Sequence, residues 1–111
     1  MLCRAWQREV FIYPPAPGRG GNAFSPQGRR TAACVQPLRG ELSQRLYGLE
    51  AEHMRLMLCG LCGEPRAGDG VCVEAAQGEP PDFRVVYAAR WPGHWEAHLR
   101  RIPEAERGAD E

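Results

Sequence analysis

The feature that most constrains this chain is an alternation of apolar and polar residues between positions 82 and 102. A two-residue period is typical of a strand with one buried face, so we predict a central strand over residues 82–91. Pro92-Gly93 then favours a tight turn into a second strand over residues 94–102. The expected faces are Phe83, Val85, Tyr87, Ala89 and Trp91 on the first strand, and Trp95, Ala97 and Leu99 against Glu96, His98 and Arg100 on the second.

The N-terminal third combines strand signals with a long segment rich in glycine and proline. Residues 8–13, Arg-Glu-Val-Phe-Ile-Tyr, are β-branched and aromatic and stop at Pro14-Pro15, which predicts a first strand. Residues 14–30 contain four prolines and four glycines and predict a long flexible loop. Residues 31–39 have strand character, but Pro37 lacks an amide donor, so we expect a strand at a sheet edge.

The middle of the chain predicts two more strands and leaves one segment open. Leucines at helical spacing make a short helix compete with irregular structure over residues 41–49. Gly68-Asp69-Gly70 is expected to launch a short strand over residues 71–75 as part of a hairpin. Residues 53–59 alternate as in a strand with one well-buried face, with Met54, Leu56 and Leu58 on one side and Arg55, Met57 and Cys59 on the other.

The elements together predict a mainly β fold in one domain of 111 residues. About six short strands without βα alternation favour a small antiparallel barrel or sandwich, with a long N-terminal Gly/Pro-rich loop and at most one short helix. The β core is expected over residues 8–102, the flexible loop over 14–30 and a frayed tail over 103–111.

Composition narrows the range of functions. All 14 basic residues are Arg and they balance 14 acidic ones, so no overall field attracts nucleic acid or a membrane. Without lysine, Schiff-base and phosphate-loop lysine chemistry is excluded. No apolar stretch approaches the roughly 20 residues that span a bilayer, which predicts a soluble protein without a membrane partner. Five cysteines without a secretory signal predict reduced thiols.

The cysteines are also candidate metal ligands. Cys59-Gly-Leu-Cys62 is half of a zinc signature, Cys72 could add a third ligand, and His53 or a remote cysteine a fourth, but the spacing matches no common zinc module. We therefore predict no bound metal, with Cys59, Cys62 and Cys72 as the candidates should one bind. Cys34 and Cys72 are interpreted as small core residues. A redox role for the Cys-x-x-Cys pair lacks the expected βαβ context.

No residue set predicts catalysis. The hydroxyls of Ser25, Ser43 and Thr31 stand in no nucleophile motif, and the glycines of residues 18–21 precede no phosphate-binding helix. We predict a protein that is not an enzyme and has no cofactor and no small-molecule substrate. Histidines four apart would lie about 13 Å from each other on a strand, so surface contact is favoured over metal binding. The interface candidates are Arg19, Arg29, Arg30, Trp91, Trp95, His94 and His98.

The order of these features, over about residues 8–102, resembles the head-closure (head–tail connector) proteins of long-tailed bacteriophages and prophages. The residues that carry the resemblance are Val10-Phe11-Ile12-Tyr13, the Gly/Pro-rich loop, Tyr47-Gly48 with Met54-Arg55-Leu56, Gly68-Asp69-Gly70-Val71, Phe83-Arg84-Val85 and the strand from Trp91 to Leu99. The Cys-x-x-Cys turn departs from what the family would have there.

The resemblance implies a small barrel subunit without catalytic residues, located in the virion after assembly in the bacterial cytoplasm. It would form a homo-oligomeric ring beneath the portal and adaptor, close the packaged head and receive the tail. The expected partners are portal, adaptor and tail-completion proteins, with packaged DNA adjacent. Residues 14–30 would contact a neighbouring subunit or plug the DNA channel. The alternative is a small zinc-binding interaction module that uses Cys59 and Cys62. Ring size, the neighbouring proteins and a free-phage or prophage origin stay open.

Overall fold

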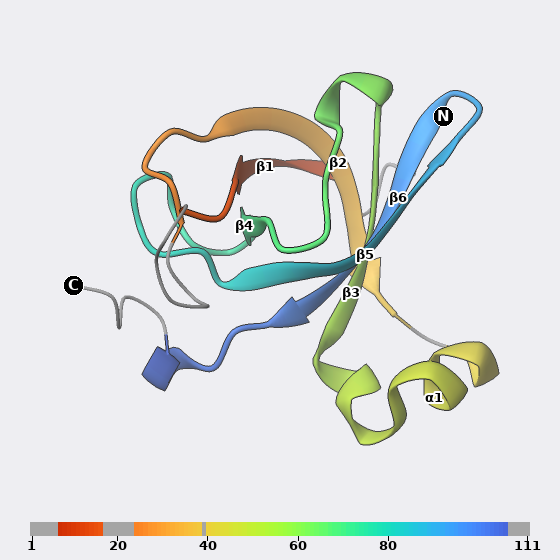
Figure 1. The fold of residues 1–111 in the computed structure, drawn as a ribbon. Helices are drawn as coiled ribbons and strands as arrows, with labels where there is room; N and C mark the ends of the chain where they lie inside the picture. Colours follow the sequence, from red (N-terminus) through yellow and green to blue (C-terminus); the bar gives the residue numbers. More distant parts are fainter. Residues whose placement is uncertain (1–6, 17–23, 39, 107–111) are drawn as a thin grey trace.

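The computed structural model describes residues 7–16, 24–38 and 40–106, which form a closed antiparallel barrel (Figure 1). The strands follow one another around the barrel in the order β1-β2-β3-β6-β5-β4, and β4 pairs with β1 to close it. The elements are β1 (Gln7–Tyr13), β2 (Arg29–Pro37), α1 (Glu41–Tyr47), β3 (Met54–Cys59), β4 (Gly70–Cys72), β5 (Phe83–Trp91) and β6 (His94–Arg101), with 3-10 helices at Gly48–His53, Leu61–Gly63 and Glu104–Glu106. The predicted mainly β fold with six strands and one short helix is confirmed.

The first two strands form a hairpin whose connection is shorter than predicted. Arg29 and Arg30 already belong to β2, and they pair with Ile12 and Phe11 of β1. The two ends of the connection also meet, because Ser25 N–H donates to the carbonyl of Pro14 at 2.8 Å and a bridge joins Pro15 to Phe24. Residues 17–23 of the predicted flexible loop over residues 14–30 lie outside the described residues.

The prediction that the second strand lies at a sheet edge is wrong. β2 pairs with β1 along one side and with β3 along the other. Pro37 is tolerated because it is the last residue of the strand, where its missing N–H interrupts no inner pair.

β4 is shorter than predicted and makes a different pairing. It ends at Cys72 because the next three backbone N–H groups, those of Val73, Glu74 and Ala75, donate to the buried carboxylate of Asp82 at 2.9, 2.9 and 3.2 Å. These donors are therefore lost to any ladder. β4 pairs with β1 and β5 and not with β3, so the expected hairpin around Gly68-Asp69-Gly70 does not form.

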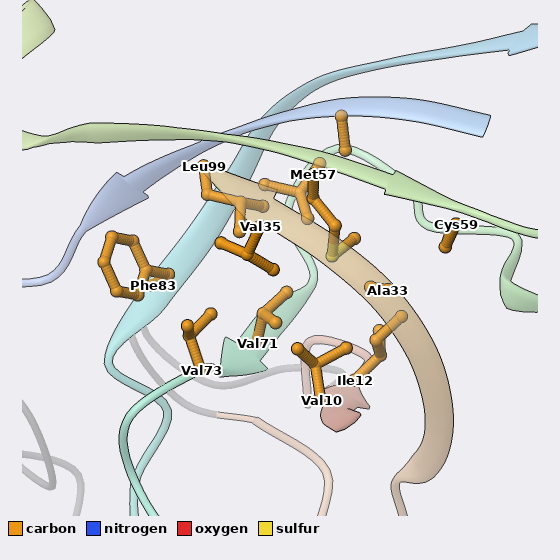
Figure 2. Close-up of a cluster of buried hydrophobic side chains, with 12 residues drawn as sticks. Val10, Ile12, Ala33, Val35, Met57, Cys59, Val71, Val73, Phe83 and Leu99 are labelled. Carbon is orange, nitrogen blue, oxygen red and sulfur yellow. The ribbon is translucent and has the colours of Figure 1, made fainter. Parts of the chain in front are cut away.

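The barrel interior is filled by side chains that point toward one another (Figure 2). Both strands of the predicted C-terminal hairpin contribute, with Ala97 and Leu99 of β6 fully buried as expected. On β3 the face of Met57 and Cys59 turns toward the core. The cluster is Val10, Ile12, Ala33, Val35, Met57, Cys59, Val71, Val73, Phe83, Val85, Ala97 and Leu99.

A bulge in β5 overturns the prediction of a single apolar face. The pairing with β6 shifts by one residue between Val85 and Tyr87. Because side chains alternate along a strand, one extra residue exchanges the two faces beyond it. Ala88 consequently packs against the core, while the side chains of Tyr87 and Trp91 are 44% and 48% exposed.

The described residues contain no helix with the length and hydrophobicity that crossing a bilayer requires.

Candidate functional site

A chain of hydrogen-bonded side chains lies on the outer wall of the barrel, where α1 meets β6. The Tyr47 hydroxyl lies 2.7 Å from Nδ1 of His98, and Nε2 of His98 lies 3.1 Å from Oε2 of Glu96. A carboxylate only accepts, so the arrangement favours a proton on Nε2 of His98 and donation by the tyrosine to Nδ1. The indole N–H of Trp91 donates to the other oxygen of Glu96 at 3.1 Å.

The bulge in β5 and the end of α1 bring these groups together. Tyr47 is the last residue of α1, and Tyr87 is the first residue after the register shift. The rings of both tyrosines contact His98, with centroids 5.7 and 4.8 Å from its imidazole. The His98 side chain is therefore only 12% exposed, although it points away from the core.

The electrostatics of this cluster fit a positioning role. Burial raises the pKa of Tyr47, and the nearby Tyr87 raises it further against the lowering effect of Arg100. A tyrosine with a raised pKa keeps its proton at neutral pH, so it donates a hydrogen bond and is a poor nucleophile. The chain from Tyr47 to Glu96 thus holds α1 against the barrel.

Several apolar side chains on α1, on the 3-10 helix after it and on β5 are exposed. Leu49 lies in the 3-10 helix that follows α1 and is 91% exposed, and Leu46 on α1 is 57% exposed. Tyr87 and Trp91 are the exposed large apolar side chains of β5. Tyrosine and tryptophan in such positions combine a large apolar area with one polar group, which is the composition of energetically important interface residues. We call Leu46, Leu49, Tyr87 and Trp91 the aromatic face.

One edge of β5 lacks a partner strand among the described residues. β4 pairs only with Phe83 and Arg84, and two further hydrogen bonds reach Val85, from its N–H to Asp69 and from Gly68 to its carbonyl. Beyond Val85, the described residues provide β5 with no partner strand other than β6. The β5–β6 hairpin accordingly projects from the barrel in Figure 1. Such an edge presents alternate backbone donors and acceptors to any strand that approaches it.

The interface candidates predicted on the last two strands have different environments. Trp91 and His98 belong to the site, and His94 is the register partner of Trp91. Trp95 instead packs against the core, and its indole N–H donates to the carbonyl of Leu61 at 3.3 Å. Trp95 is therefore mainly a structural residue.

The two arginine candidates that the structure describes, Arg29 and Arg30, belong to β2. Arg30 forms an exposed ion pair with Glu9 at 3.7 Å. Arg29 donates to the carbonyls of Gly63 and Glu64, at 2.6 Å for the shortest of these bonds. Arg29 therefore stabilises the turn after β3. Glu64 in that turn has a positive φ of 43°. Arg19 lies outside the described residues.

Arg29 also faces a buried carboxylate, that of Asp69, at 4.0 Å. Burial raises the pKa of Asp69, and the hydrogen bond from the Arg66 N–H together with the charges of Arg29 and Arg66 offsets part of that effect. This carboxylate is a structural anchor of the turn.

The metal candidates do not share one environment. Cys59 and Cys72 are buried, whereas Cys62 is exposed. Burial raises the pKa of the Cys59 thiol to about 11, with Arg29 lowering it slightly, so this thiol stays protonated at neutral pH. Within the described ranges no three His, Cys, Asp or Glu residues are grouped as a metal site would need. Cys34 is disulfide-bonded, so the expectation of five reduced thiols is wrong at this position.

Comparisons with known proteins place no relative beside this chain. No protein-family model matches it, no curated protein matches its sequence, and no solved structure matches its fold.

Sequence reasoning missed Tyr47 and Glu96 of the hydrogen-bonded chain, and Leu46, Leu49 and Tyr87 of the aromatic face. Tyr47 could be placed only once α1 was known to end beside β6. Glu96 carried a usable signal, because it shares a strand face with His98 two residues away.

Proposed function

We propose that this chain is a non-catalytic assembly subunit that binds other proteins through the aromatic face and the adjacent edge of β5. The observation that carries the proposal is the edge of β5 from Val86 to Trp91, which has no partner strand among the described residues and lies beside the exposed rings of Tyr87 and Trp91. An extended segment of a partner can add to such an edge through backbone hydrogen bonds, while the rings supply apolar contact.

The barrel interior supports a binding role over a catalytic one. Apolar side chains fill the space between the strands. In the hydrogen-bonded cluster on the outer wall, Tyr47 keeps its proton and is therefore not an activated nucleophile. This arrangement suits the recognition of another protein by surface contact.

The assembly that fits best is the head–tail junction of a long-tailed bacteriophage. A small barrel subunit without catalytic residues is what the resemblance to head-closure proteins implies. In that setting the chain would form a ring, close the portal and adaptor complex and provide the surface for tail attachment. The resemblance to head-closure proteins is the reason for proposing this assembly, and the aromatic face is the surface proposed to make the contacts.

The experiment is coexpression of the chain with the proteins encoded on either side of its gene, followed by electron microscopy of the purified assembly. We expect a ring or a stable complex that Trp91→Ala and Ala89→Lys abolish. Ala89 faces Glu96 in the register, so a lysine there can pair with it and keep the hairpin while obstructing strand addition.

Leu61→Ala is the matched control, because Leu61 is also exposed but lies in the turn after β3. A chain that stays monomeric with every neighbour, or a complex that tolerates both substitutions, contradicts the proposal.

The zinc-binding alternative stays a prediction, and no observation in the described residues favours it. Metal analysis of the purified chain, with Cys59→Ser as the control, tests it. A thiol reagent should modify Cys62 rapidly and Cys59 slowly in the folded chain, because only the former is exposed.

A further inference from the structure

The edge of β5 that lacks a partner strand among the described residues is short and bounded at both ends. At one end, the N–H of Val85 donates to Asp69, and its carbonyl accepts from Gly68. At the other end, Pro92 has no N–H and begins the turn into β6. Only residues 86–91 are therefore open to a further strand, and they belong to the hairpin that projects from the barrel in Figure 1.

The hairpin turn determines which backbone groups this open edge presents. Trp91 and His94 are register partners on either side of a two-residue turn, so they form a hydrogen-bonded pair. Backbone groups alternate along a strand, so the N–H and carbonyl of Ala89 also point toward β6. The N–H and carbonyl groups of Ala88 and Arg90 point the other way. The open edge therefore offers the donors and acceptors of these two residues.

The side chains beside this edge are arranged symmetrically about Ala89. Tyr87, Ala89 and Trp91 share one face, because Ala88 between them packs against the core on the other. The rings of Tyr87 and Trp91 are both exposed. An exposed aromatic ring thus lies two residues before the small Ala89, and another lies two residues after it.

A second copy of the same strand fits this pattern when it approaches antiparallel. A two-fold axis normal to the sheet keeps the side chains of both strands on matching faces. With the axis at Ala89, Tyr87 of each copy lies opposite Trp91 of the other, in a pair without backbone bonds, where side chains are closest. Ala88 and Arg90 then exchange backbone hydrogen bonds on both sides of the axis. We infer that the open edge of β5 pairs with the same edge of a second copy in this register.

The neighbouring two-fold registers are less favourable. An axis at Arg90 would place two guanidinium groups directly opposite each other, which destabilises a sheet. An axis at Ala88 would place Trp91 opposite Val85, whose backbone groups are already bonded to Asp69 and Gly68. The register centred on residue 89 avoids both problems and pairs both rings.

Pairing of two copies also protects this edge from open-ended aggregation. Once two copies have paired, both open edges are covered, and a two-fold contact closes at two copies. The contact consists of one short strand pair and the rings beside it, which is smaller than the roughly 1,200–2,000 Å² of stable complexes, so we expect a weak, reversible dimer. This inference rests on the proposed function in one respect: the same edge is used, so a strand of another partner would displace the second copy.

The dimer is tested by sedimentation equilibrium of the isolated chain from about 10 µM to about 1 mM, where a weak association becomes populated by mass action. We expect a reversible monomer–dimer equilibrium. Trp91→Ala removes the ring pairs and should weaken dimerisation about tenfold. Leu61→Ala is the matched control, because Leu61 is exposed but lies in the turn after β3, and it should change nothing. A chain that stays monomeric at the highest concentration, or a dimer that both substitutions weaken equally, overturns the inference.

Crosslinking tests the register. Ala89 would face its own copy across the axis, at a separation that a disulfide can bridge. In a Cys62→Ser background, which removes the exposed native thiol, Ala89→Cys should form a covalent dimer under mild oxidation. Arg90→Cys is the matched control, because residue 90 is more exposed but would face residue 88 of the other copy. Equal crosslinking of the two variants overturns the inference.

The self-paired dimer and the proposed complex with other proteins can be distinguished. If a complex with neighbouring proteins requires Trp91 but the chain alone stays monomeric, only the self-pairing is refuted. If the chain dimerises and crosslinks as expected but forms no complex with any neighbour, only the proposed function fails.

Discussion

Asp82→Asn tests the most heavily used buried carboxylate in the barrel. Asp82 is 2% exposed, and its two oxygens accept from the N–H groups of Val73, Glu74 and Ala75. The asparagine side chain has the same shape but places an NH₂ group where one oxygen stood, so donor faces donor at one end. The loop after β4 then loses the contact that ends the strand and turns the chain toward β5.

The magnitude follows from the three bonds. If the amide oxygen keeps the bonds to Glu74 and Ala75, the N–H of Val73 is left unpaired and nearly buried, which costs about 1–3 kcal/mol. The two remaining bonds lose their charge and weaken by roughly 0.5–1 kcal/mol each. We expect a total loss of about 3 kcal/mol in the free energy of unfolding, a large part of the stability of a domain this size.

The assay is urea unfolding followed by tryptophan fluorescence. A loss of about 3 kcal/mol lowers the unfolding midpoint by roughly 1–3 M urea. Glu79→Gln is the matched control, because Glu79 accepts a similar 2.8 Å bond from the N–H of Ala76 in the same loop but is exposed. It should cost under about 1 kcal/mol. Equal losses for the two variants would refute the reasoning, because burial would then have no influence on the value of these bonds.

Three further substitutions probe the site and the core. Tyr47→Phe removes the 2.7 Å hydrogen bond to His98 and should lower the free energy of unfolding by about 1 kcal/mol. Amide hydrogen exchange in residues 41–53 should become faster, and unchanged exchange there would contradict the idea that this bond holds α1 against the barrel. Gly70→Ala brings a Cβ within 2.8 Å of two neighbouring rings and should cost about 1–3 kcal/mol in urea unfolding, whereas Gly60→Ala, with open space around it, should cost far less. In the folded chain the Cys59 thiol has a pKa of about 11 and keeps its proton up to that pH. In the unfolded chain the thiol ionises near its ordinary pKa of about 8.5–9. The free energy of unfolding therefore falls by about 2–3 kcal/mol as pH rises between these two values. Cys59→Ala should lower stability at neutral pH but remove that alkaline slope, and an unchanged slope would show that the thiol is not the cause.

Local sequence was a good guide wherever one strand face is buried along its whole length. Ala97 and Leu99 of β6 face the core as their alternation predicts. The turn at Pro92-Gly93 was also predictable, because Gly93 supplies a positive φ of 90°. The candidate site was predicted in part: Trp91 was a candidate because it adjoins the hairpin turn, and His98 because it lies on the polar face of the second strand.

The sequence by itself determined the six strands, because apolar alternation, proline and glycine act on the backbone locally. Only the tertiary structure decided which strands pair, where β5 shifts its register and which face Tyr87 presents. Barrel closure depends on pairing between distant segments such as β1 and β4, and no local pattern encodes that choice. The single extra residue of the bulge is likewise fixed by the partner strand, and it turns Tyr87 from an expected core side chain into an exposed one.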